Sequence, residues 1–128
     1  MINSDRIRQV FITERLYQVR SALRLMVVDL HMQVVGEAAD WAEALALAPK
    51  SHADMLLVHW GLLPEATGSA LADFRRACPD MRVVVISGQP TARQAALTAG
   101  ANAFISKAEA PDRFAEQLLA AANGQGSS

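Results

Sequence analysis

The sequence contains a single cysteine, Cys78, and has almost no net charge. One cysteine cannot form an internal disulfide, and it leaves no cysteine framework to interpret. The 12 Lys and Arg residues are scattered along the chain against 13 Asp and Glu, so the formal charge is only −1. Because a nucleic-acid-binding surface needs clustered basic residues, we expect no direct contact with nucleic acid.

Long hydrophobic runs are also absent, since no apolar stretch reaches the length of a membrane span. The opening residues, Met1 to Asp5, are not followed by the apolar core of a signal peptide. We therefore expect a cytoplasmic chain that does not bind membranes. Residues 124–128, Gly-Gln-Gly-Ser-Ser, have the composition of a flexible tail or the start of a linker, so residues 1–123 are predicted to form one domain.

What the sequence does contain is an alternation of short apolar runs and longer helical patterns. An apolar fraction of 52% in 128 residues is enough for a folded domain with a real core. The apolar runs lack polar alternation, which is typical of central parallel strands covered on both faces. They are Ile7–Ile12, Val34–Ala38, Met55–His59, Val83–Ser87 and Ala103–Ser106.

The segments between these runs have the spacing of amphipathic helices. Their expected inward faces are Leu16, Val19, Leu23 and Val27 in the first, Leu71, Phe74 and Ala77 in the third, and Phe114, Leu118 and Ala121 in the fifth. Asp40 and Glu43 resemble a capping box at the start of the second, and Gly100 is expected to end the fourth. Five successive strand–helix units predict a three-layer α/β/α sandwich with a parallel sheet.

In such folds the functional site lies where the strands end. The residues that follow the strands are Thr13-Glu14-Arg15, His59-Trp60-Gly61, Ser87-Gly88-Gln89 and Lys107. We therefore expect these side chains, from distant parts of the sequence, to lie close together.

Three segments together resemble the receiver domain of LuxR/NarL-type response regulators. They are Val-Val-Gly-Glu-Ala at 34–38, Arg-Val-Val-Val-Ile-Ser-Gly at 82–88 and Ala-Gly-Ala-Asn-Ala-Phe-Ile-Ser-Lys at 99–107. The resemblance extends over residues 7–123. It implies a CheY-like, flavodoxin-like sheet with strand order 2-1-3-4-5 and a role in two-component phosphorelay signalling.

The resemblance also implies a set of site residues. In that family an acidic pair after the first strand binds Mg²⁺, and an aspartate ending the third strand accepts a phosphoryl group from a histidine kinase. A Ser or Thr after the fourth strand and a Lys after the fifth contact that group. Ser87, Lys107 and the strand aromatic Phe104 match the family, whereas Glu14-Arg15 retains only one carboxylate of the acidic pair.

The position of the acceptor aspartate falls on His59. Neither Asp54 nor Asp73 can be moved to the end of the third strand without breaking its apolar register. With a neutral His59 the formal charge of the pocket is +1, instead of −2 in a complete pocket. Near a surface each charge pair at 4 Å is worth about 4 kcal/mol, so this sign opposes a dication. We predict no metal, no cofactor and no phosphorylated aspartate.

Several roles stay open from the sequence alone. Arg15 either pairs with Glu14 in place of the metal or faces water, and Lys107 either pairs with Glu14 or remains solvated. Ser87 is either a ligand of a bound group or a strand-end cap. Trp60 is expected to fill the space that an acyl phosphate would occupy, with a partner contact as the alternative.

Three functions compete. The first is a degenerate receiver, a non-enzymatic interaction module whose partners are a histidine kinase or another regulator and an output domain beyond the C-terminus. A homodimer through the fourth helix, fifth strand and fifth helix is a further option. The fourth helix contains small residues that would permit close packing, namely Ala92, Ala95, Ala96 and Ala99. The second is a phosphorylatable receiver of a LuxR-type transcriptional regulator. The third is a flavin-binding protein, which would require a glycine-rich phosphate loop after the first strand.

Overall fold

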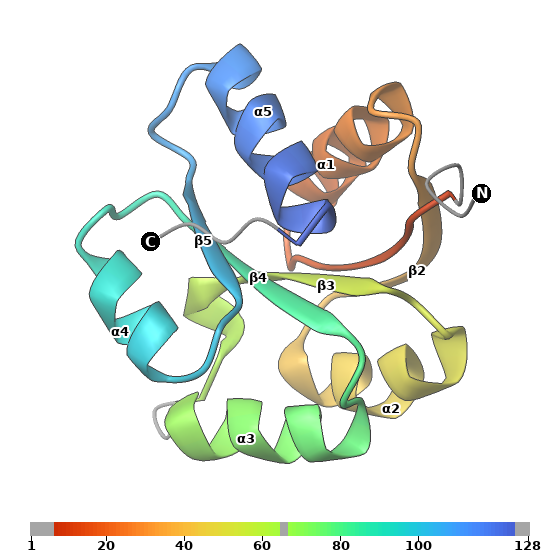
Figure 1. The fold of residues 1–128 in the computed structure, drawn as a ribbon, viewed down its shortest axis with the longest axis vertical. Coiled ribbons are helices and arrows are strands. Elements are labelled where there is room, and N and C mark those ends of the chain that lie inside the picture. Colours follow the sequence, from red (N-terminus) through yellow and green to blue (C-terminus); the bar gives the residue numbers. More distant parts are fainter. Residues whose placement is uncertain (1–6, 65–66, 125–128) are drawn as a thin grey trace.

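The computed structural model describes residues 7–64 and 67–124. Strands and helices alternate along them (Figure 1). The strands are β1 (Gln9–Thr13), β2 (Gln33–Ala38), β3 (Met55–His59), β4 (Arg82–Ser87) and β5 (Ala103–Ser106). The helices are α1 (Tyr17–Asp29), α2 (Trp41–Ser51), the 3₁₀ turn η2 (Trp60–Leu62), α3 (Thr67–Ala77), α4 (Ala92–Thr98) and α5 (Pro111–Ala122).

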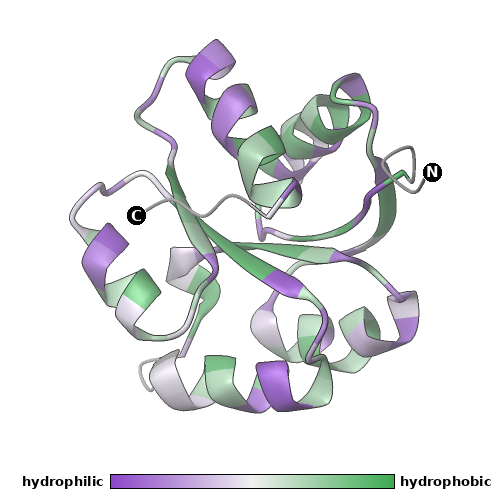
Figure 2. Cartoon of the chain, viewed as in Figure 1, coloured by the Kyte–Doolittle hydropathy of each residue, from purple (hydrophilic) through white to green (hydrophobic). Residues whose placement is uncertain are grey.

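The five strands form one parallel sheet in the order β2-β1-β3-β4-β5, which confirms the predicted fold class. Helices α1 and α5 cover one face, and α2, α3 and α4 cover the other (Figure 1). The strands are the most hydrophobic part of the chain, and the hydrophilic residues lie mainly on the helices and loops (Figure 2). Each face of the sheet therefore has its own core, as expected for strands without polar alternation.

Local capping fixes several helix ends. The side chain of Asp40 accepts a hydrogen bond from the Glu43 N–H at 2.8 Å, so the predicted cap of α2 is confirmed. Gly100 and Gly124 follow α4 and α5 with positive φ angles of 115° and 85°, as expected for residues just past a helix C-terminus. Residues 125–128 of the predicted tail lie outside the described residues.

Some details of the predicted strands and helices are wrong. The first strand begins at Gln9 and includes Thr13, rather than spanning residues 7–12. Leu16 has an extended backbone ahead of α1 and is 57% exposed, so it does not face inward. In α3 the buried stripe continues from Phe74 to Cys78 because residues four apart share a helix face, which leaves Ala77 exposed.

A close contact joins β1 to β2. The pairing register shifts between Val10 and Phe11, so that Phe11 lies opposite Gly36. A Cβ atom on Gly36 would lie 2.6 Å from the Phe11 ring, and Phe11 is itself 1% exposed. Glycine is therefore required at position 36 for steric reasons.

Within the described residues, no helix has the length and apolar character needed to span a bilayer.

Candidate functional site

The predicted site residues lie at the carboxyl edge of the sheet. The registers place Thr13 beside Val58 and His59 beside Ile86, so β1, β3 and β4 end at the same level. The Lys107 N–H donates to the Ser87 carbonyl at 2.8 Å, which brings the end of β5 alongside β4. Side chains from four strands therefore meet, as the parallel topology requires.

Glu14 is the buried acid of the site. It is only 4% exposed, and its Oε1 lies 3.3 Å from the Nζ of Lys107. Its Oε2 accepts a hydrogen bond from the Leu16 N–H at 3.0 Å. Of the two alternatives for Lys107, the structure has the pairing with Glu14, and both carboxylate oxygens are engaged by groups of the protein itself.

Arg15 is the second cation beside the buried acid. It is exposed, and within residues 7–64 and 67–124 it makes no ion pair with Glu14. The solvent-facing alternative is therefore the correct one. Even so, Arg15 lines a hollow of about 200 Å³ together with Glu14, His59 and Gly61, so its charge lies at the mouth of the site.

His59 ends β3 at this hollow and is half-buried. Its Nδ1 accepts a hydrogen bond from the Gly61 N–H at 3.2 Å, which requires that this nitrogen carry no proton. Burial lowers the pKa of His59, and the charges of Lys107 and Arg15 lower it further, whereas Glu14 partly offsets them. Neutral imidazole is therefore favoured, and within the described residues no carboxylate bonds to the ring to activate it as a nucleophile.

The family-type metal does not fit this donor set. Mg²⁺ prefers several oxygen ligands in octahedral geometry. The site offers one carboxylate, whose oxygens already bind Lys107 and the Leu16 N–H, with the cation of Arg15 beside it. Across the described ranges, no group of three His, Cys, Asp or Glu side chains converges.

Ser87 acts as a strand-end cap. It is 3% exposed, and its Oγ accepts a hydrogen bond from the Gln89 N–H at 3.0 Å. The hydroxyl therefore holds the start of the loop between β4 and α4. Of the two roles left open for Ser87, ligand of a bound group and strand-end cap, the structure has the second.

Trp60 does not occupy the site. It is half-buried and packs against the core on the α2–α3–α4 face, and it is not among the residues that line the hollow. The prediction that its ring fills the acyl-phosphate position is wrong. The physical reason is the alternation of side chains along an extended backbone, which turns Trp60 to the face opposite His59.

The aromatic residue of β5 lies deep in the core. Phe104 is fully buried, and the guanidinium of Arg93 on α4 lies 5.2 Å from its ring centroid. Ala92 and Ala96 of α4 are buried in the same cluster, whereas Ala95 is exposed. Ala99, which follows α4, also packs against this cluster, so three of the four small residues are used for packing.

Sequence reasoning missed Arg20 and its partner Glu37, which lie next to the site. Arg20 of α1 donates from Nη1 to the Glu14 carbonyl at 2.7 Å, and its Nε lies 3.1 Å from Glu37 Oε1 at the end of β2. In the sequence, this pair could have been found from Arg20, one turn into the first helix, and Glu37, near the end of the second strand. Thr13 is 1% exposed, and its Oγ1 has no hydrogen-bond partner among the described residues.

Comparisons with known proteins agree with the fold described above. A family model described as "Response regulator receiver domain" matches residues 10–119. The transcriptional regulatory protein CitT of Bacillus subtilis is 33% identical over 90 residues, which cover 68% of this chain and 39% of CitT. This chain spans between 39% and 58% of the length of the curated relatives that it matches.

Two solved structures share the fold. The isolated REC domain of RcsB from Salmonella enterica serovar Typhimurium, in the presence of the phosphomimetic BeF₃⁻, has a TM-score of 0.80 at 20% identity, covering 94% of this chain and 92% of that one. A LuxR family two-component response regulator from Aurantimonas sp. SI85-9A1 has a TM-score of 0.83 at 21% identity, covering 95% and 89%. At these identities the likeness shows the fold.

Proposed function

Because the chain belongs to the response regulator receiver domain family, we propose that it is a receiver of a two-component transcriptional regulator that signals without phosphorylation of an aspartate. The observation that supports this proposal is the ion pair between Glu14 and Lys107. In this arrangement the cation that would contact a phosphoryl group is already neutralised, and the acceptor position holds His59. The signal would then be a protein contact, and the chain would act as a non-enzymatic module.

The expected partners are a histidine kinase or another regulator, together with an output domain. The curated relatives are longer than this chain, which is consistent with an output domain in the whole proteins. A homodimer through α4, β5 and α5 is the second candidate for the input. We rank it lower, because Ala92 and Ala96 are buried against the sheet and cannot contact a second copy.

The competing function is a receiver that is still phosphorylated. Adding BeF₃⁻ and Mg²⁺ to the full chain and following tryptophan fluorescence separates the two, because Trp60 adjoins His59. We expect no saturable response. A saturable response that requires Mg²⁺ would refute the proposal.

Flavin binding has little support. The segment after β1 is Thr13-Glu14-Arg15, which has no glycine and carries a carboxylate where a flavin phosphate would lie. A colourless purified protein, with no flavin absorbance after denaturation, would exclude this function.

A further inference from the structure

Helix α2 is apolar on its solvent side as well as on its inner side. The inner side packs on β1 and β2 through Trp41, Ala44 and Ala48. The exposed apolar residues are Ala42, Leu45, Ala46, Leu47 and Pro49, and the two leucines are 41% and 42% exposed. A helix that is apolar all round is normally buried on every side. The solvent side of α2 therefore has the character of a surface that a partner covers.

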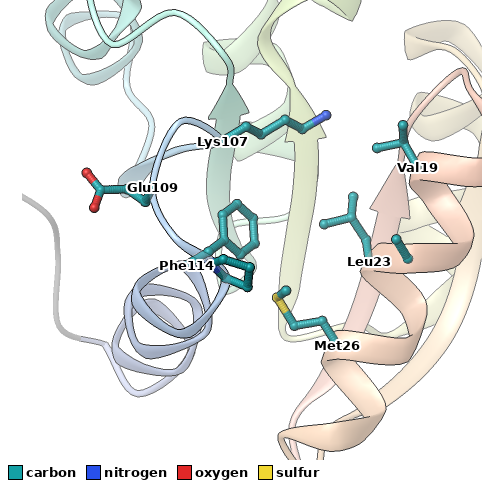
Figure 3. A pocket seen from close by; sticks show the side chains of 8 residues that line it. Val19, Leu23, Met26, Lys107, Glu109 and Phe114 are labelled. Atoms are coloured by element: carbon teal, nitrogen blue, oxygen red, sulfur yellow. The ribbon is translucent and has the colours of Figure 1, made fainter.

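The apolar residues between α1 and α5 are different, because these two helices cover each other. Leu23 and Met26 of α1 face Phe114 of α5 across a hollow (Figure 3), and Leu23 and Phe114 are each only 6% exposed. Helix α2 lies on the opposite face of the sheet, over the edge strand β2 and beside α3 (Figure 1). Its solvent side is a ridge rather than a cavity, and this shape suits another domain better than a small molecule.

Two opposite charges interrupt the apolar side of α2. They are Glu43 in its first turn and Lys50 in its last, and both are exposed. Oε1 of Glu43 accepts a hydrogen bond from the Ala39 N–H at 2.7 Å, so the second carboxylate oxygen is available to another group. Among the described residues, neither side chain forms an ion pair. Seven residues are two helical turns, or about 10 Å, so the two charges lie on the same side of the helix.

We propose that the solvent side of α2 is the contact between two copies of this chain, with the two α2 helices antiparallel across a two-fold axis. An axis level with Ala46, which lies close to midway between the charges, places each Glu43 opposite the partner's Lys50. Two ion pairs then form at once, whereas a parallel arrangement would bring like charges together. The short side chains of Ala42 and Ala46 permit a close approach of the helix axes. This inference does not depend on the proposed function, because it uses no residue of the receiver site.

The length of α2 predicts a weak dimer. Its 11 residues span about 16 Å, so a contact made by one helix from each copy falls below the roughly 1,200 Å² of a stable interface. We therefore expect a dissociation constant between about 10 μM and 1 mM. The dimer would leave the α1–α5 hollow of both copies uncovered, because that hollow lies on the other face of the sheet.

Two measurements on the full chain test the proposal. Sedimentation equilibrium at concentrations up to about 1 mM determines the oligomeric state and the dissociation constant. Amide shifts in ¹H–¹⁵N spectra, recorded over the same concentrations, locate the contact. We expect a reversible dimer, with concentration-dependent shifts centred on residues 40–52.

Charge reversal tests the antiparallel arrangement. Lys50→Glu places two carboxylates opposite each other at both ends of the contact, and it should weaken dimerisation roughly tenfold. Glu43→Lys should weaken it in the same way through paired lysines. An equimolar mixture of the two variants should form a heterodimer, because every facing pair then has opposite charges. The chain that carries both substitutions should dimerise as the wild type does.

A substitution near the two-fold axis tests the apolar part of the contact. Ala46→Glu keeps a good helix former but brings two like charges together at the axis, so we expect no dimer at the highest concentration. The matched control is Leu25→Glu, because Leu25 is 66% exposed on α1 at the other face of the sheet, and this variant should dimerise as the wild type does. Circular dichroism of each variant establishes that a loss of dimer does not come from unfolding.

Three results would overturn the proposal. The first is a chain that stays monomeric at about 1 mM, which would leave the solvent side of α2 to a different protein. The second is a dimer that Ala46→Glu and Lys50→Glu leave unchanged, because the copies would then meet through another face. The third is a mixture of folded Lys50→Glu and Glu43→Lys chains that forms no heterodimer, because the charges would then not face each other.

Discussion

The ammonium of Lys107 lies 3.3 Å from the carboxylate of Glu14, 93 residues earlier in the chain. The carboxylate is almost fully buried and the ammonium side chain is 27% exposed, so the pair is more shielded than a surface ion pair. The pair links the end of β1 to the end of β5 across the width of β3 and β4. It gives the receiver site a fixed internal partner where the family has a metal and a phosphoryl group.

Removing the charge of Glu14 should destabilise the domain. Glu14→Gln keeps the shape and an acceptor for the Leu16 N–H but leaves Lys107 without its counterion, so we expect a loss of about 1–3 kcal/mol in the free energy of unfolding by urea. Lys107→Met should also destabilise, and the double variant should cost less than the sum of the two. The matched control is Asp73→Asn, which breaks the exposed Asp73–Arg76 pair and should cost less than 1 kcal/mol. Additive costs at Glu14 and Lys107 would show that the pair is not coupled.

The contact between Phe11 and Gly36 predicts a steep steric effect. Gly36→Ala places a methyl group 2.6 Å from a buried ring, and we expect it to lower the free energy of unfolding by about 1–3 kcal/mol. Gly68→Ala is the control, because a Cβ there meets nothing within 4 Å and alanine favours the helix, so stability should rise by up to about 1 kcal/mol. Adding Phe11→Leu should relieve part of the cost at position 36. Equal effects of the two alanine substitutions would contradict the steric reading.

His59 predicts a pH dependence of stability with a definite sign. Its folded-state pKa lies below the ordinary value of about 6.5, so the unfolded chain takes up the proton first as the pH falls. The contribution of neutral His59 to the free energy of unfolding is therefore complete above about pH 6.5. It declines below that pH, until His59 is protonated in the folded protein as well. Protonation also removes the acceptor for the Gly61 N–H.

The measurement is the difference in melting temperature between wild type and His59→Asn from pH 7.5 to 5. We expect the wild type to lose stability relative to the variant as the pH falls. The control is His52→Asn, because His52 is exposed with a φ of 58°, a conformation that asparagine tolerates. If the melting temperature of the wild type rose relative to that of His59→Asn as the pH falls to 5, the sign would be reversed, and this would contradict the lowered pKa.

The sequence was sufficient for the sheet and for the edge where the site lies. Apolar runs without alternation, such as Met55–His59, identify buried parallel strands, and their ends must then share one edge. The direction of individual side chains was less predictable. Trp60 lies on the face of the sheet opposite His59, because it directly follows that strand-end residue. Leu16 is exposed because α1 begins only at Tyr17. The Phe11–Gly36 contact depends on a register shift that no local pattern reveals.

Restoring the carboxylates should restore the metal site. The double substitution Arg15→Asp and His59→Asp leaves three carboxylates against Lys107, a formal charge of −2, and oxygen ligands from two strand ends. We expect the variant to bind Mg²⁺ by isothermal titration calorimetry and to give the saturable fluorescence response to BeF₃⁻ that we expect the wild type to lack. Either single variant should bind Mg²⁺ more weakly than the double variant does. Arg15→Asp still lacks the acceptor aspartate, and His59→Asp keeps the Arg15 cation at the mouth of the hollow. If the double variant binds neither Mg²⁺ nor BeF₃⁻ although it folds, the missing carboxylates are not what prevents phosphorylation, and the cause must lie in the backbone of the site.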